Sequence, residues 1–229
     1  MREDLNLTSQ RRIAVLKPIK LIIENVETDF IETCHAPNHP KKPELGKRKI
    51  NFTKELYIDS DDFQENPVTG FFRLQPGGRV RLRYAYVVEC TGFKKDKDGK
   101  IIYVKAKIFS DSKSGTPGAN NYKVKGNIHW VSARDACSVQ INFYERLFEE
   151  SKIDENSCNT DLQKTQDVIL NQESHLKINS ITEASILSAK VGEKFQFERH
   201  GYFVLDEILE NKIRVFNRTV SLKDNWQKR

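Results

Sequence analysis

Three arginines recur at every second position in the segment GGRVRLRYAYVVEC, residues 77–90. Because successive side chains of a strand point to opposite faces, Arg79, Arg81 and Arg83 are predicted to share one face. Like charges on one face repel each other. The row is therefore either a solvated outer face of a half-buried sheet or a face that binds a polyanion. A planar guanidinium can donate two parallel hydrogen bonds to a phosphate or to a base edge.

A second segment, FQFERHGYF, combines aromatic and polar side chains. As a strand it places Phe195, Phe197 and Arg199 on one face. Gln196 and Glu198 then lie on the other face, where a buried aromatic backing would aim them at a ligand. An amide suits a uracil edge, and a glutamate opposite RNA must accept from a base or orient an arginine.

Motifs for nucleotide hydrolysis and metal binding are missing from the chain. Neither a G-x-x-x-x-G-K-[ST] nor a G-x-G-x-x-G loop occurs, so nucleotide hydrolysis is not expected. In the segment CHAPNH, the spacing of Cys34, His35 and His39 does not match common structural zinc sites. No metal site is predicted.

Two further groups could do acid–base chemistry. His129 could act as a general base, but no acidic or nucleophilic residue neighbours it in sequence. A strand histidine with satisfied hydrogen bonds is the favoured interpretation. The carboxylates of Asp61 and Asp62 are interpreted as negative charge at the amino end of a helical turn. We therefore predict no catalytic residue and a chain that binds its partner without catalysis.

Short alternating or β-branched runs make up most of the chain, and turn-forming residues separate them. FKKDKDGKII is the clearest hairpin, with Asp98 and Gly99 between two alternating runs. Helix is predicted in DLNLTSQRRIAVL, in a turn at SDDF capped by Ser60, and in TEASILSAKVG between Thr182 and Gly192. The predicted fold is mainly β, with two antiparallel Greek-key-like β-barrels and few short helices.

The length of 229 residues accommodates two modest domains. The predicted division gives residues 1–118 to a first barrel with an amino-terminal connector and residues 119–229 to a second barrel. Exchange of strands between the barrels is left open. The polar segment 149–167 is predicted to be a long surface loop of the second unit.

The net charge of +6 is concentrated in the first part of the chain. Residues 1–130 hold 24 Lys+Arg and 16 Asp+Glu, whereas residues 131–229 hold 14 and 16. This asymmetry predicts an anionic partner. A membrane partner is not expected, because no apolar run reaches the roughly 20 residues that cross a bilayer. The amino terminus also lacks the apolar centre of a secretory signal. Four scattered cysteines fit reduced thiols and a cytoplasmic protein.

Eight groups of residues follow one another along the chain in an order that matches a known family. They are DLN with RRIAVLKPIKLIIEN, PNHPKKPELGKR, FTKELYIDSDDF, FFRLQPGGRVRLRYAYVV, VKGNIHWVSA, YERLF, FQFERHGYF and FNRTVSLKDNW. Together they resemble the carboxyl-terminal anticodon-binding region of the glutaminyl-tRNA synthetase family over nearly the whole chain. The resemblance implies two β-barrels, of a kind shared with a ribosomal protein that binds 5S rRNA. The barrels would hold the anticodon loop of tRNA(Gln) between them.

The resemblance also implies that catalysis belongs to a part absent from this sequence. The family's ATP-binding Rossmann domain, with its His-Ile-Gly-His and Lys-Met-Ser-Lys-Ser type signatures, would lie before residue 1, and neither signature occurs here. The full-length parent is expected to be a monomeric class I glutamine–tRNA ligase that uses ATP with Mg. The chain alone is expected to be non-catalytic and to hold no cofactor.

The family's tRNA contacts can be carried over to individual positions. The tRNA-binding residues that the resemblance implies are Arg11, Arg73, Arg81, Arg83, Gln196, Glu198 and Arg199. Of these, Arg81 and Arg83 match residues near the first anticodon base and its backbone, and Arg73 matches an arginine at the third base. The other four match positions around the middle and third bases. Gly70 and Phe72 replace polar or cationic side chains of relatives, so Phe72 could instead stack on a base.

Three other interpretations stay open at this point. The chain could be the corresponding region of a glutamyl-tRNA synthetase, a ribosomal protein that binds structured rRNA, or an enzyme with an unrecognised site. The two-barrel length argues against the ribosomal protein. Each predicted site residue could also be an ordinary exposed charge.

Overall fold

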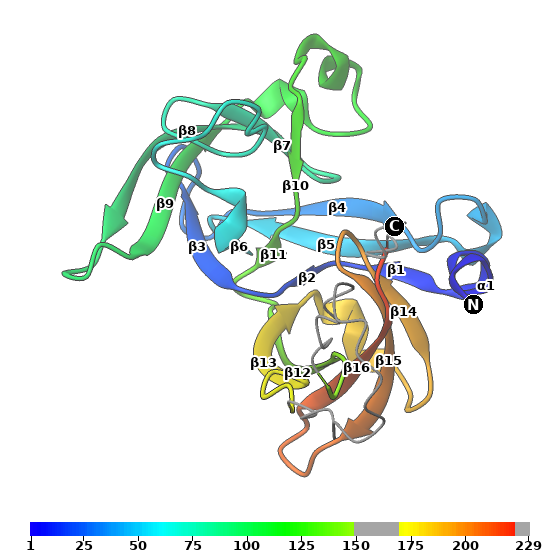
Figure 1. The fold of residues 1–229 in the computed structure, drawn as a ribbon. Helices are drawn as coiled ribbons and strands as arrows, with labels where there is room; N and C mark the ends of the chain where they lie inside the picture. Colours follow the sequence, from blue (N-terminus) through cyan, green and yellow to red (C-terminus); the bar gives the residue numbers. More distant parts are fainter. Residues whose placement is uncertain (149–169, 223–229) are drawn as a thin grey trace, which may run out of the picture.

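The computed structural model describes residues 1–148 and 170–222. It consists mainly of β-strands in two seven-stranded sheets and a two-stranded ribbon (Figure 1). Each large sheet curves into a barrel or half-barrel. The prediction of a mainly β protein built from two barrels is confirmed. The predicted surface loop at 149–167 lies outside the described residues.

The first sheet contains two arginines of the predicted row, Arg79 and Arg81, and the predicted hairpin. Its strands, in order across the sheet, are β10 (Gly126–Ile128), β7 (Arg79–Leu82), β8 (Val87–Lys95), β9 (Ile101–Ile108), β3 (Pro18–Ile23), β6 (Glu55–Asp59) and β11 (Val131–Ser132). The β8–β9 hairpin turns at Asp98 and Gly99, as predicted. Gly99 has a φ of 79°, a left-handed conformation that glycine adopts without strain.

The second sheet takes its two outermost strands from the amino end of the chain. In order, it comprises β1 (Gln10–Arg12), β14 (Lys194–Phe197), β15 (Gly201–Ile208), β16 (Arg214–Val220), β12 (Cys137–Tyr144), β13 (His175–Thr182) and β2 (Ala14–Val15). The first sheet in turn includes β10 and β11 from the middle of the chain. The second sheet therefore combines two separate parts of the sequence, whereas the first lies within residues 18–132, with the ribbon inserted.

The remaining elements are a ribbon and short helices. They are β4 (Ile31–Pro37), β5 (Lys47–Thr53), α1 (Arg2–Thr8), and the 3-10 helices η1 (Pro43–Leu45), η2 (Ser60–Asp62), η3 (Ser110–Ser112), η4 (Pro117–Asn121) and η5 (Ala184–Ser188). The ribbon runs along the junction of the two barrels toward α1 (Figure 1). The predicted first helix is too long, because the chain enters β1 at Gln10.

The predicted helix between Thr182 and Gly192 is also wrong in extent and in its cap. Thr182 ends strand β13, and only Ala184–Ser188 is helical, with Glu183 at the cap position. Glu183 does not cap with its side chain. Instead, its carboxylate accepts the backbone N–H of Ile13 at 2.9 Å and pairs with Arg48. A tertiary ion pair has overridden the local capping pattern.

Each sheet encloses its own apolar core. Phe52, Trp130 and the aliphatic residues of β3 and β6 fill the first core, whereas Phe197, Phe203 and Phe216 lie in the second. The segment from Ile13 to Val15 passes between the two cores: Ile13 and Val15 pack in the first and Ala14 packs in the second. This alternation along one strand ties the amino end to both barrels.

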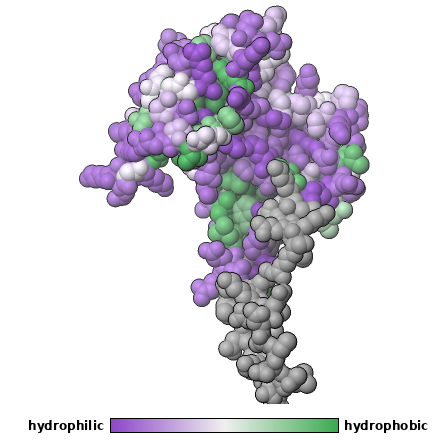
Figure 2. All heavy atoms as spheres, turned by 45° about the horizontal axis from the view of Figure 1, so that its top comes forward, coloured by the Kyte–Doolittle hydropathy of each residue, from purple (hydrophilic) through white to green (hydrophobic). Residues whose placement is uncertain are grey.

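The face drawn in Figure 2 has little apolar continuity. Figure 2 shows a face that is largely hydrophilic, with hydrophobic residues in small separate groups. Among the residues that the structure describes, no helix has the length and apolar character needed to cross a bilayer.

Candidate nucleic-acid interface

The first turn of the candidate site joins β7 to β8. Strand β7 ends at Leu82, so the prediction that three arginines share one strand face is wrong for Arg83. Tyr84 has a φ of 64°, a left-handed conformation that is strained for a side chain of this size. The N–H of Arg83 donates to the carbonyl of Ile128 at 3.0 Å, and the indole of Trp130 donates to the carbonyl of Arg83 at 2.8 Å. These bonds fix the turn.

The second turn joins β14 to β15. Strand β14 ends at Phe197, and Arg199 has a φ of 72°. The N–H of His200 closes the turn on the carbonyl of Phe197 at 2.9 Å. Glu198 is 4% exposed, so the expectation that it shares an open face with Gln196 is wrong. The alternation that placed it there stops where the strand ends.

Glu198 is the centre of a buried cluster that joins the two turns. The Nε atom of Arg83 lies 2.5 Å from its Oε2, and the Tyr84 hydroxyl donates to Oε1 at 3.1 Å. Nη2 of Arg48 reaches the same Oε1 at 3.4 Å. The Nε2 atom of His129 is 3.7 Å from Oε2. Groups from the first barrel thus surround a carboxylate of the second.

The cluster sets the protonation of its members. Burial alone would raise the pKa of Glu198, but the nearby His129 ring and the charges of Arg83 and Arg48 lower it to about 2. Burial lowers the pKa of His129. This histidine lies between β10 and β11, not on a strand as expected. Neither of its ring nitrogens is hydrogen-bonded within the part of the chain that the structure describes.

A second ionic group joins Arg73 and Arg199 through Asp62. Nη1 and Nη2 of Arg199 donate to Oδ2 and Oδ1 of Asp62 at 2.6 and 2.7 Å, and Nη1 of Arg73 also donates to Oδ1. The Asp62 side chain is fully buried, whereas those of Arg73 and Arg199 are 37% and 28% exposed. Although burial opposes it, the Asp62 carboxylate raises the pKa of Arg199. Arg199 therefore carries full charge.

Arg11 and Gln196 lie opposite each other on the paired strands β1 and β14. Gln196 donates from Nε2 to the Tyr202 hydroxyl at 2.8 Å, and that hydroxyl donates to Oδ1 of Asn6 at 3.2 Å. Nη2 of Arg11 donates to the same oxygen at 2.5 Å. Arg11 is only 5% exposed. Arg11, Gln196, Tyr202 and Asn6 thus form one chain of hydrogen bonds that contains no carboxylate.

Arg81 lies apart from the other predicted residues. Its guanidinium donates to the carbonyls of Ser112 and Ala119 at 2.7 and 2.8 Å, and so holds the loop that contains η3 and η4. Arg79, which is not among the predicted tRNA contacts, pairs with Glu89 at 2.5 Å. The structure thus brings six of the seven predicted residues into three neighbouring groups and gives Arg81 a separate structural contact.

Sequence reasoning missed the partners of these residues. They are Asn6, Arg48, Asp62, Tyr84, Glu183 and Tyr202. Arg48 alone had a usable signal, because it alternates in step with Ile50 and Phe52 and is therefore on the buried face of β5. No local pattern marks the others, not even Asn6 and Tyr202, whose partners Arg11 and Gln196 are only five and six positions away.

Phe72 is a large exposed aromatic beside the second ionic group. Its side chain is 56% exposed and directly precedes Arg73 in the chain. Nζ of Lys125 lies 4.9 Å from the centre of its ring. An open ring with a cation on it is suited to stacking on an unpaired base.

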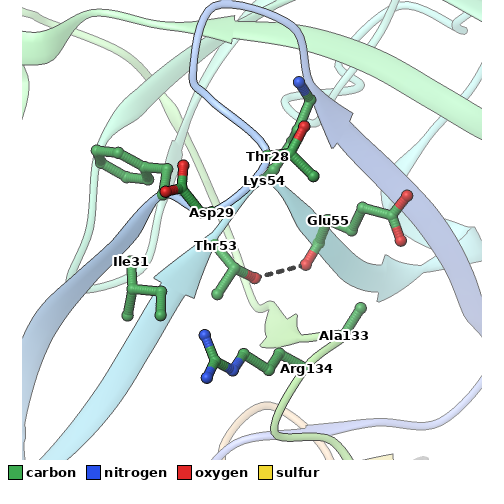
Figure 3. Close-up of a pocket in the computed structure, with 9 residues that line it drawn as sticks. Thr28, Asp29, Ile31, Thr53, Lys54, Glu55, Ala133 and Arg134 are labelled. Atoms are coloured by element: carbon green, nitrogen blue, oxygen red, sulfur yellow. Dashed lines mark hydrogen bonds between the residues drawn. The ribbon is translucent and has the colours of Figure 1, made fainter.

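A hollow of about 520 Å³ lies elsewhere, between the ribbon, β6 and the segment that follows β11. Figure 3 shows Asp29, Lys54, Glu55 and Arg134 around it, with Thr53 donating to the carbonyl of Glu55 at 2.8 Å. Its lining carries both signs of charge and none of the predicted site residues. We do not include it in the candidate interface.

The CHAPNH segment has structural contacts. Nε2 of His39 donates to the carbonyl of Asn6 at 2.9 Å, while its Nδ1 accepts the N–H of Lys41 at 3.1 Å. Cys34 is buried in β4. Within residues 1–148 and 170–222, no three His, Cys, Asp or Glu side chains are grouped so as to hold a metal ion.

Two curved β-sheets with partly exposed arginines at their junction are features of a β protein that binds a polyanion. Models of the anticodon-binding domains of class I tRNA synthetases (E and Q) match residues 9–109 and 127–206. The chain belongs to this family, that of the synthetases for glutamate and glutamine, and its place within the family is with the glutamine–tRNA ligases. The predicted family is confirmed.

Relatives named as glutamine–tRNA ligases match the chain from end to end. The ligase of Ralstonia nicotianae is 50% identical over 229 residues, which is 100% of this chain and 38% of the relative. That of Nitrosomonas europaea is 49% identical over 229 residues, 100% of this chain and 40% of the relative. That of Polynucleobacter necessarius is 47% identical over 234 residues, which is 99% of this chain and 39% of the relative. The chain thus spans about two fifths of their length.

Proposed function

We propose that this chain recognises the anticodon loop of tRNA(Gln), so that the enzyme to which it belongs ligates glutamine to that tRNA with ATP and Mg. One observation carries the proposal: Arg73 and Arg199, from different barrels, converge on Asp62 while both side chains stay partly exposed. An unpaired loop placed there would meet both barrels at once. Single-stranded RNA is read in this way, by cations and polar groups around splayed bases.

The proposed site keeps all seven predicted residues, in different roles, with Arg81 acting only through the loop that its guanidinium holds. Arg73, Arg83 and Arg199 have exposed side-chain surface and serve as direct contacts. Gln196 is half-buried and offers an amide to a base edge. The buried Arg11 and Glu198 would read RNA only through groups they hold. We assign neither ATP nor Mg to any residue of this chain.

The test is binding of the anticodon stem-loop of tRNA(Gln) to the 229-residue chain, followed by fluorescence anisotropy. Arg73→Ala is expected to weaken binding by about 1–3 kcal/mol if Arg73 reads a base, and to relax discrimination against stem-loops with altered anticodons. If Arg73 contacts phosphate only, the log–log salt slope instead falls by about 0.7 and every RNA loses equally.

Arg79→Ala is the matched control, because Arg79 is an exposed arginine six positions further along the chain and outside the proposed site. It is expected to leave discrimination unchanged. Equal affinity of the wild-type chain for the stem-loops of tRNA(Gln) and tRNA(Glu) would refute the glutamine assignment. Preference for 5S rRNA in competition would refute anticodon recognition itself.

Phe72→Ala is expected to weaken stem-loop binding by about 1–3 kcal/mol, the usual worth of one stacked base. Its midpoint of thermal unfolding should not move, because the ring is 56% exposed. Val68→Ala, on the same loop and 70% exposed, is the control and should bind normally. Full binding by Phe72→Ala would remove this ring from the interface.

We also propose that the parent enzyme is monomeric and cytoplasmic, and that the chain divides into barrels at 1–118 and 119–229. The free thiols of Cys34, Cys90 and Cys137 fit a reducing compartment. The exchange of strands between the sheets crosses the proposed division.

A further inference from the structure

Asp62 is held in place by its backbone as well as by its side chain. It ends η2, its carbonyl accepts the N–H of Leu74 at 3.0 Å, and Phe63 bridges to Leu74. The segment that carries Phe72 and Arg73 is therefore closed on Asp62 at its base. The carboxylate of the same residue also accepts a hydrogen bond from the Arg73 guanidinium.

The same carboxylate also pairs with an arginine of the second barrel. Arg199 donates two parallel bonds to it, from a turn in the left-handed conformation. We infer that Asp62 is a positioning residue of the RNA site, which fixes two arginines of different barrels at one spacing for contact with a single loop. This inference rests on the proposed function and adds a residue that would not touch RNA.

A competing interpretation is that RNA displaces Asp62 from its arginines. Burial argues against it. The carboxylate has no exposed surface, so withdrawal of both guanidiniums would leave an unpaired charge in the interior. Displacement is also unnecessary, because a guanidinium has five N–H donors. The bonds to Asp62 use two donors of Arg199 and one of Arg73.

Asp62→Asn separates positioning from simple electrostatics, because electrostatics predicts a change in affinity and positioning predicts a change in discrimination. Removal of a negative charge beside RNA strengthens binding if Asp62 acts through charge alone. If it positions, discrimination between the tRNA(Gln) stem-loop and one with an altered anticodon should fall by roughly fivefold or more, the lower end for one base contact. Asp61→Asn is the control: it makes the same charge change on the neighbouring residue, whose side chain is 75% exposed.

Unchanged discrimination in a folded Asp62→Asn variant overturns the inference while leaving the proposed function intact. Lack of discrimination by the wild-type chain overturns the proposed function itself. If Asp62→Asn does not unfold cooperatively, Arg199→Lys decides. That variant keeps both charges but cannot make the paired bonds, so wild-type discrimination by it also overturns the inference. In an Arg73→Ala/Arg199→Ala background, Asp62→Asn should change discrimination no further.

Discussion

Replacement of Arg48 by alanine is expected to lower the free energy of unfolding by about 3–5 kcal/mol, as measured in urea. The Arg48 side chain is 5% exposed and lies between two buried carboxylates. Its Nε is 2.5 Å from Oε1 of Glu183, its Nη2 is 3.4 Å from Oε1 of Glu198, and its Nη1 donates to the carbonyl of Pro37 at 2.6 Å. Without the cation, both carboxylates remain in the interior with less compensation.

Lys49→Ala provides the matched control, because Lys49 is the exposed neighbour of Arg48 on the same strand. A change within about 0.5 kcal/mol is expected there. A loss below about 1 kcal/mol for Arg48→Ala would show that the two barrels are not held together by these ion pairs. In that case the apolar contacts of Ile13, Ala14 and Val15 would have to supply the junction.

Local sequence patterns, namely turn residues and the alternation of polar and apolar residues, predicted much of the fold. The Asp98-Gly99 hairpin and the buried faces of Phe195 and Phe197 follow from turn chemistry and from alternation. Both signals depend on residues that are neighbours in the sequence. They act wherever one strand passes directly into the next, and there the structure agrees with them.

The alternation of side chains along a strand gave wrong predictions where the strand ended without a glycine or proline to mark its end. The sequence RLRYAY continues its pattern through Arg83 and Tyr84, yet Tyr84 takes the left-handed conformation and the strand stops at Leu82. Glu198 and Arg199 repeat this at the end of β14. In both places a non-glycine residue bears backbone strain that tertiary contacts hold in place.

The pairing of the site residues with their partners could not be predicted from the sequence, although the burial of Arg48 could. Asp62 reads as a charge at the start of a helical turn, and only the fold brings it to Arg199, 137 positions along the chain. Arg48 and Glu198 are 150 positions apart. Ion pairs of this separation depend on how two barrels dock, which no local pattern encodes.

Replacement of Glu198 by glutamine is expected to cost about 3–4 kcal/mol of unfolding free energy at pH 7. The pKa of this carboxyl falls from its ordinary 4.5 to about 2, and each unit corresponds to about 1.4 kcal/mol. A lowered pKa means that the folded chain binds the proton less readily than the unfolded chain. The contribution is therefore complete above about pH 4.5 and is lost as the pH falls toward about 2.

Unfolding of the wild type and of Glu198→Gln, measured at intervals from pH 7 to pH 2, should give curves that converge between about pH 4.5 and 2. Glu44→Gln, which alters an exposed carboxylate on η1, should follow the wild type at every pH. A gap that stays constant down to pH 2 would mean that the charges of Arg48 and Arg83 do not stabilise the Glu198 carboxylate. Convergence would establish that the turn carrying Arg199 is anchored to the first barrel by charge, since Glu198 directly precedes Arg199. Acid would then loosen the RNA site before either apolar core.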